Sequence, residues 1–173
     1  MVVAVASTGL LAGAVKAGTA TADTSNSAPI HVKGELTAPP ATAVGLDCNV
    51  AGACIANVAS TNTWTGGLTG TSESRDSVAG DVKGNVTFVS FDLFTGHVQG
   101  CGDGSIIIQG HITRPFTQPG QGTLEVVKNT GSGGLAKLTG QGTFYVVPDP
   151  GGSSATSTYS MTLSCNGQPP EDS

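Results

Sequence analysis

The chain has 173 residues, of which 38% are hydrophobic, 11% are charged and 26 are glycine, and its formal net charge is −5. So few charged residues argue against a helical bundle, whose outer faces carry long charged side chains, and the hydrophobic content argues against wholesale disorder. The acidic balance and the lack of a basic patch argue against nucleic-acid binding. The composition favours a small, secreted, all-β protein with one domain.

The N-terminal segment has the pattern of an export signal. Residues 1–15 are apolar or small, a run too short to span a bilayer, and they lead to Ala20-Thr21-Ala22, which resembles a signal-peptidase site. We therefore expect a signal peptide at 1–22, a β-domain at 23–165 and a disordered tail at 166–173, with no membrane span in the mature chain. No basic residue precedes the apolar run, although signal peptides usually begin with one. A start codon further upstream would supply the missing basic residues. The alternative is an N-terminal helix or strand of the domain.

Strands are expected along most of the remaining chain. Residues 30–37 alternate between apolar and polar, the period of a half-buried strand, and Pro39-Pro40 ends it because proline cannot donate to a ladder. A loop that carries the first two cysteines follows. Further strands are expected within 55–75, 85–98, 105–113, 122–127, 143–147 and 155–163, with one helical turn within 128–140. Seven or eight short strands predict a single antiparallel barrel of about eight strands, or alternatively a β-sandwich.

The most apolar of these segments, residues 85–98, has large hydrophobic side chains at both odd and even positions. This pattern is typical of a central strand that is covered on both faces, or of two strands joined at a bulge near Asp92. The residues alone do not separate the two.

Four cysteines, Cys48, Cys54, Cys101 and Cys165, are an even number in a chain expected to be exported, which predicts two disulfides. Three pairings are open, and we favour Cys48–Cys54 and Cys101–Cys165. A zinc site is disfavoured because the chain has no C-x-x-C pair and its three histidines are scattered. We expect no metal and no cofactor.

A glycine-rich stretch, residues 130–144, reads TGSGGLAKLTGQGTF. It resembles the G-[ST]-G-x-[LF]-A-x-L-x-G-x-G-x-F signature of the allene-oxide-cyclase-like barrels, and in particular a secreted bacterial branch of that superfamily. Residues 68–72 and 91–100 resemble two of its other strands, so the likeness covers about residues 60–147. It implies an eight-stranded barrel with a partly open interior, in a superfamily that includes cyclases of oxylipins and polyketides and the dirigent proteins. The catalytic residues of the plant cyclases have no counterparts here.

Asp92 is the most informative charged residue because it lies between Phe91 and Leu93. If its side chain points into a barrel, burial would raise its pKa and suit it to acid–base work or ligand contact. The alternative is a residue that faces solvent or lies at a bulge. Trp64 and Phe88 are the aromatic candidates for the wall of a ligand site.

Three other polar residues are weaker candidates. Glu73 and Arg75 share one face of a strand, either as an interior polar pair or as an exposed ion pair. His111 follows an isoleucine-rich run, either as a general base or ligand contact inside the barrel or as a surface histidine.

Two functions follow as hypotheses. The first is an exported barrel that binds a small apolar molecule or acts as an extracellular interaction module without catalysis. The second is a cyclase or isomerase that holds an apolar substrate inside the barrel, with Asp92, Glu73 or Arg75 supplying polar contacts. Whether copies of the chain associate is left open.

Overall fold

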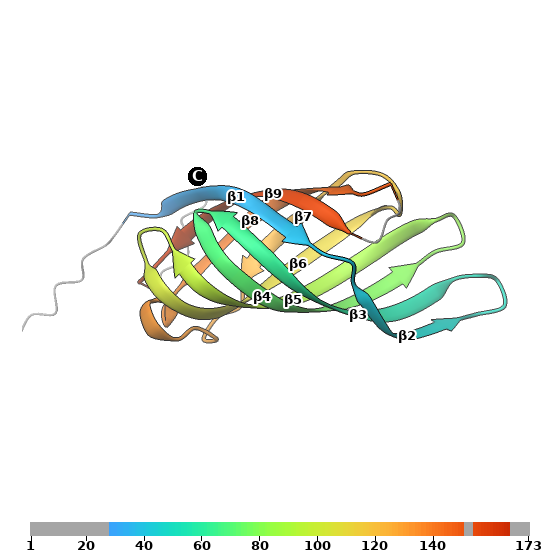
Figure 1. Ribbon diagram of the computed structural model, residues 1–173, viewed down its shortest axis with the longest axis horizontal. Helices are drawn as coiled ribbons and strands as arrows, with labels where there is room; N and C mark the ends of the chain where they lie inside the picture. Colours follow the sequence, from blue (N-terminus) through green and yellow to red (C-terminus); the bar gives the residue numbers. More distant parts are fainter. Residues whose placement is uncertain (1–27, 151–153, 167–173) are drawn as a thin grey trace, which may run out of the picture.

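The structure is a computed structural model that describes residues 28–150 and 154–166. The expected signal peptide, residues 1–22, lies outside these residues, as does the expected tail beyond Asn166. The described chain forms nine strands and one short 3-10 helix (Figure 1): β1 Ile30–Ala38, β2 Thr42–Cys48, β3 Cys54–Gly66, β4 Leu68–Gly80, β5 Asn85–Val98, β6 Gly102–Pro115, β7 Gly120–Val126, η1 Gly133–Leu135, β8 Thr139–Pro148 and β9 Ala155–Ser164. None of the described helices is long and apolar enough to cross a membrane.

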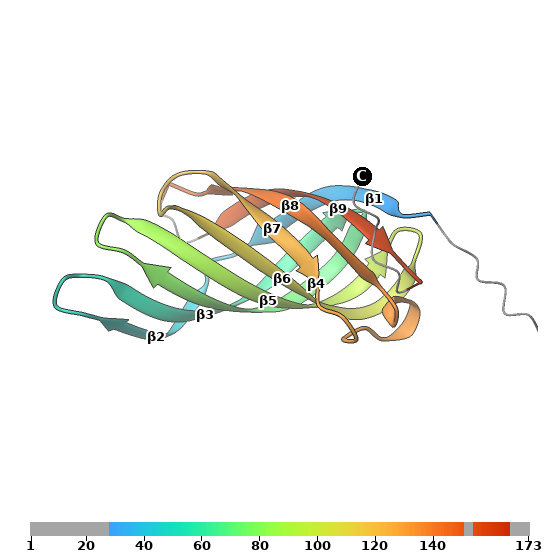
Figure 2. The ribbon, with the colours of Figure 1, turned by 180° about the vertical axis from the view of Figure 1, so that it is seen from behind.

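All strand pairs are antiparallel, and the sheet closes on itself. Its order is β1-β9-β8-β7-β6-β5-β4-β3-β2, and β1 also pairs with β3. Strands β1 and β3–β9 therefore form a closed eight-stranded barrel, which Figures 1 and 2 show from opposite sides. The barrel prediction is confirmed, and the sandwich alternative is wrong because closure leaves one continuous sheet.

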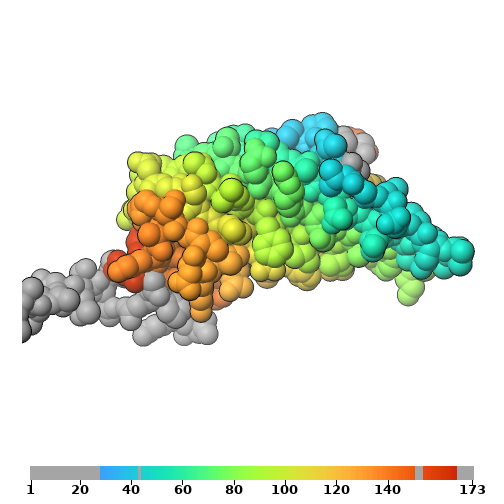
Figure 3. Space-filling view, turned by 90° about the horizontal axis from the view of Figure 1, so that it is seen from below, coloured from blue at the N-terminus to red at the C-terminus, as the bar shows by residue number. Residues whose placement is uncertain are grey.

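The ninth strand, β2, lies outside this cylinder. The end of β3 near its own C-terminus, Thr63–Gly66, pairs with β1, whereas Cys54–Ala59 pairs with β2. The β2–β3 hairpin forms the tip of one end of the molecule, opposite the end that carries the glycine-rich loop and η1 (Figure 3). We expected a loop in place of β2. The described side chains of β2 are exposed, so this strand buries neither face against the barrel.

One half of the barrel interior is a packed hydrophobic core. It contains Val32, Trp64, Leu68, Phe94, Val98, Ile106, Ile108, Leu124, Val126, Tyr159, Met161 and Leu163. The loop between β7 and β8 covers this end, where Leu135 of η1 and Leu138 are buried in the same cluster. The expected helical turn within residues 128–140 is confirmed, and it closes this half of the barrel.

Tyr159 fastens the point at which the barrel closes. Its ring lies across Gly34 of β1, where a Cβ atom would come within 2.5 Å of the tyrosine oxygen. The hydroxyl accepts the N–H of Leu68 at 2.8 Å and lies 3.0 Å from the carbonyl of Thr65, to which it donates. One side chain of β9 thus satisfies main-chain groups around the β3–β4 turn.

Strand β5 runs without interruption from Asn85 to Val98, in register with both neighbours. The bulge considered near Asp92 is therefore absent from it. The hydrophobic residues on its second face are exposed: Phe91 by 46% and Leu93 by 49%, while Asp92 and Phe94 point inward and are buried. The apolar residues on the second face of β5 therefore form part of the outer surface of the barrel.

Both favoured disulfides are present. Cys48 and Cys54 lie opposite each other in the β2–β3 hairpin, with Cα atoms 4.1 Å apart. Cys101 and Cys165 join the β5–β6 turn to the end of β9 across a sequence separation of 64.

Candidate functional site

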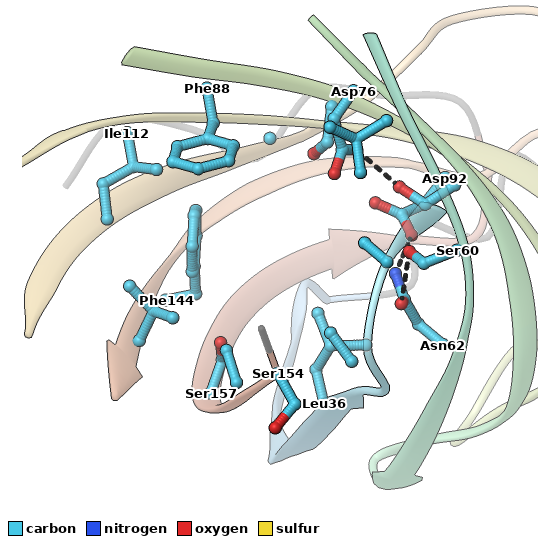
Figure 4. Close-up of a pocket in the computed structure, with 18 of the residues that line it drawn as sticks. Leu36, Ser60, Asn62, Asp76, Phe88, Asp92, Ile112, Phe144, Ser154 and Ser157 are labelled. Carbon is cyan, nitrogen blue, oxygen red and sulfur yellow. Dashed lines mark hydrogen bonds between the residues drawn. The ribbon is translucent and has the colours of Figure 1, made fainter. Parts of the chain in front are cut away.

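The half of the barrel that η1 does not cover contains a cavity of about 180 Å³. Its lining extends outward to Pro39 and Ala41, which are exposed, so the cavity opens at the end of the barrel where β1 and β8 finish. The side chains that line it come from β1, β3, β4, β5, β6, β8 and β9 (Figure 4).

Asp92 is the centre of a polar wall on one side of this cavity. It is only 3% exposed, because β5 places it inside the barrel opposite Ser74 of β4. Asn62 Nδ2 donates to Asp92 Oδ1 at 2.9 Å, and the Ser72 hydroxyl donates to the same oxygen at 2.7 Å. Burial raises the pKa of Asp92, and the hydrogen bonds from Ser72 and Asn62 offset part of that rise.

This polar wall is joined to the packed core through Trp64. The indole Nε1–H donates to the Ser72 hydroxyl at 2.9 Å, and Ser72 in turn donates to Asp92. The Trp64 ring packs against Phe94 and Tyr159, with centroid distances of 6.0 and 5.3 Å. The packed Trp64 ring therefore holds Ser72 in place, and Ser72 in turn orients the carboxyl group of Asp92.

A second carboxyl group, that of Asp76, lies further toward the mouth. Ser74 donates to its Oδ1 at 2.7 Å. Burial raises the pKa of Asp76, the bond from Ser74 lowers it, and the neighbouring charge of Asp92 raises it again. The cavity thus holds two carboxyl groups that are close enough to repel each other, and ionisation of each is less favourable than in an exposed aspartate.

The rest of the lining is largely apolar, and we call it the apolar wall. It consists of Leu36, Phe88, Ile112, Phe144 and Val146. Phe88 shares the inner face of β5 with Asp92, and Figure 4 shows it grouped with Ile112 and Phe144. A small molecule in this space would meet hydrophobic surface on one side and hydrogen-bonding groups on the other, a composition that is typical of ligand sites.

Arg114 lies at the mouth and is the cationic residue of the lining. Its Nη1 donates to the carbonyls of Pro115, Phe116 and Gln118, and its guanidinium carbon lies 5.7 Å from the Phe88 ring centroid. Its buried Nε has no hydrogen-bond partner, and burial lowers the pKa of the guanidinium. The main task of this side chain is therefore to hold the β6–β7 turn and to cover Phe88.

The predicted site residues divide into three groups. Phe88 and Asp92 line the cavity. Trp64 is buried in the core beneath it and reaches Asp92 through Ser72. Glu73, Arg75 and His111 lie on the outer face of the barrel; His111 lines a separate surface hollow together with Glu125 and Gln141.

The outward position of Glu73 and Arg75 follows from strand parity. Ser72, Ser74 and Asp76 of β4 point inward, so the residues between them point out. Glu73 accepts a hydrogen bond from Thr61 on that face, and Arg75 donates to the carbonyl of Ser74. The structure does not bring these two side chains to the cavity.

Sequence reasoning missed the rest of the polar wall: Ser60, Asn62, Ser74, Asp76 and Ser90. A signal was available on β4, where Leu68, Ser72, Ser74 and Asp76 share a face by period two. Small polar residues in line with a core leucine indicate an interior that is not filled by apolar side chains. Within the described part of the chain, no group of three or more His, Cys, Asp or Glu residues is placed to hold a metal ion.

Fold and cavity together define the class: a disulfide-linked antiparallel β-barrel, packed at one end and hollow at the other. The chain belongs to the family described as "Protein of unknown function (DUF3224)", whose model matches residues 38–162. It is similar to the crystal structure of a protein of unknown function from this family from Shewanella oneidensis MR-1, with 23% identity and a TM-score of 0.56. The match covers 79% of this chain and 96% of the other chain. At this level of identity it shows that the two proteins share a fold. A search of curated proteins finds no match.

Proposed function

We propose that this protein binds a small, largely apolar molecule in the open half of the barrel. The observation that carries the proposal is the mixed lining of the cavity, which combines a polar wall around Asp92 and Asp76 with an apolar wall that contains Phe88 and Phe144. Because the packed core and η1 close the far end, a ligand would enter and leave through the mouth. An interaction module alone would have no need of this interior space.

We also propose that the protein is exported. Two disulfides among four cysteines, with no free cysteine in the described residues, are consistent with an oxidising compartment. The signal-peptide pattern at residues 1–22 points the same way.

Native mass spectrometry of protein purified from its own host tests the binding proposal. We expect a bound small molecule that is released on denaturation. The sharper form of the test uses two variants of neighbouring residues on β8. Val146→Phe places a ring in the cavity, whereas Val147→Phe places the same ring on the outer surface, where Val147 is 48% exposed. Loss of the bound molecule in the first variant and retention in the second supports the cavity, and equal retention in both refutes it.

One observation favours a second function, that of a cyclase or isomerase. Two carboxyl groups with raised pKa values lie beside an apolar cavity, an environment in which a carboxylic acid can give or take a proton near neutral pH. The resemblance to the allene-oxide-cyclase-like barrels suggests polyene or oxylipin substrates. The test is turnover of a panel of polyene and oxylipin substrates. Turnover that is lost in Asp92→Asn and kept in the outward control Glu73→Gln would establish the cyclase or isomerase function. An absence of turnover by the unaltered protein leaves the binding function alone.

A further inference from the structure

We propose that the ligand of the cavity is an amphipathic amine, with an apolar body against Phe88 and Phe144 and a protonated amino group against Asp76 and Asp92. This inference rests on the proposed binding function, because it names the class of molecule that the cavity takes. It follows from the hydrogen-bonding capacity of the polar wall, from its charge and from the size of the space.

Three serine hydroxyls of the polar wall and its support already donate their hydrogens to groups of the protein. A serine hydroxyl carries one hydrogen. Ser74 donates its hydrogen to Asp76 Oδ1, and Ser72 donates to Asp92 Oδ1. Ser60 donates to Asn62 Oδ1. The hydroxyl and carboxylate oxygens keep their remaining lone pairs. The wall therefore presents mainly acceptors to the cavity, so a matching ligand must bring donors.

The charge of the cavity points in the same direction. Asp76, Asp92 and Arg114 are the ionisable residues of its lining. Arg114 gives its hydrogen bonds to main-chain carbonyls. Neither Asp76 nor Asp92 forms an ion pair with another described residue. Neither carboxyl group of the cavity therefore has a cationic side chain as its partner.

Burial of a carboxylate without a cation is costly, and a ligand ammonium group would offset that cost. An ammonium group also supplies up to three N–H donors to a wall of acceptors, in charge-assisted bonds that are stronger than neutral ones. A neutral hydroxyl would satisfy hydrogen bonds but not the charge. A ligand carboxylate would add a third acidic group to the same space. The expected order of affinity is amine, then alcohol, then carboxylate.

The space sets the size of the ligand. A cavity of about 180 Å³ lies below the roughly 300–1,000 Å³ of most ligand pockets, so it takes a small molecule. A phenyl ring with a two-carbon arm is of this order. Its ring would pack against the aromatic wall while the arm reaches across to the carboxylates.

Three matched probes test the inference at pH 7: 2-phenylethylamine, 2-phenylethanol and phenylacetate. Each is titrated into the full protein, with affinity measured by calorimetry and location by NMR shifts of the Phe88 and Phe144 signals. We expect the amine to bind about tenfold more tightly than the alcohol, as the difference between charged and neutral hydrogen bonds implies. The carboxylate should bind most weakly. Asp92→Asn and Asp76→Asn should each lower amine affinity by about tenfold and leave alcohol affinity within about twofold, with Glu73→Gln as the surface control.

Alcohol binding as tight as that of the amine, or tighter binding of phenylacetate, with shifts confined to the cavity, would overturn the amine class and leave the binding function standing. If no probe moves the Phe88 and Phe144 signals, both the inference and the proposed function are overturned. The comparison of the three probes on the unaltered protein decides between these results even where a variant does not fold.

Discussion

Asn62 Nδ2 donates to Asp92 Oδ1 over 2.9 Å, although the two residues are 30 positions apart and lie on strands separated by β4. The bond passes over the inner face of β4, between the packed core and the cavity. Both side chains are buried, so each depends on the other to satisfy its polar groups. This pair is therefore part of the site and part of the fold at once.

Replacement of Asp92 separates these two roles. Asp92→Ala leaves Asn62 Nδ2 and the Ser72 hydroxyl without their acceptor, so we expect a loss of about 1–3 kcal/mol in the free energy of unfolding for the groups left unsatisfied. Asp92→Asn keeps an oxygen at the same place and should lose less. Urea denaturation of both variants measures this difference. Equal stability of the two variants at pH 7 would contradict the assigned bonds.

The dependence of stability on pH follows from the raised pKa values of Asp76 and Asp92. An acid whose pKa is higher in the folded state stabilises the fold while it is protonated, and that contribution is lost as pH rises from the unfolded value near 3.8 through the folded pKa. The free energy of unfolding of the double variant Asp76→Asn, Asp92→Asn should therefore increase relative to wild type between pH 3.5 and 7. Denaturant titrations at several pH values measure it, with Glu73→Gln as the control for loss of an outward acid. A flat difference would show that the two carboxyl groups are not desolvated.

The Trp64–Ser72 bond can be followed by fluorescence, because Trp64 is the single tryptophan of the chain. Ser72→Ala leaves the buried indole N–H without an acceptor, which should cost about 1–3 kcal/mol and change the emission spectrum of the folded state. Ser77→Ala, on the outward face of the same strand, should do neither. An unchanged spectrum and stability in Ser72→Ala would remove the link between core and cavity.

Tyr159→Phe tests the closure of the barrel. The variant keeps the ring over Gly34 but leaves the N–H of Leu68 without its partner, so we expect a destabilisation of about 1–3 kcal/mol by thermal or chemical denaturation. Tyr145→Phe is the matched control, because that tyrosine is 48% exposed on the outer face of β8. Similar losses in both would mean that the hydroxyl of Tyr159 has no special part in closure.

The two disulfides should differ in their contributions to stability. In the chain-entropy model, a cross-link stabilises more when it closes a longer loop, by about 2.4 kcal/mol for Cys48–Cys54 and about 4.3 kcal/mol for Cys101–Cys165. Paired serine variants of each bridge, compared by urea denaturation, test the order. A larger loss from removal of Cys48–Cys54 would contradict it.

Much of the barrel was predictable because strands have a period of two. Alternation in residues 30–37 and 155–163 located two strands and their buried faces, and both predictions are confirmed. The same rule placed Glu73 and Arg75 on one face. The rule could not say which face of β5 was inward, because large apolar residues occupy both faces, and so the orientation of Asp92 stayed open.

The sequence by itself determined the all-β class and most of the strands, since these depend on local alternation and turn residues, and it favoured the cysteine pairing that the structure has. Only the tertiary structure decided the addition of β2 outside the barrel, the inward turn of Asp92 and the meeting of Asn62, Ser72 and Asp76 around it. The physical reason is that the register of the β3–β4 and β4–β5 pairs brings Asn62, Ser72 and Asp76 to Asp92, and closure of β1 against β3 completes the barrel around them. The space left between the polar and apolar walls depends on that closure, and no local pattern records it.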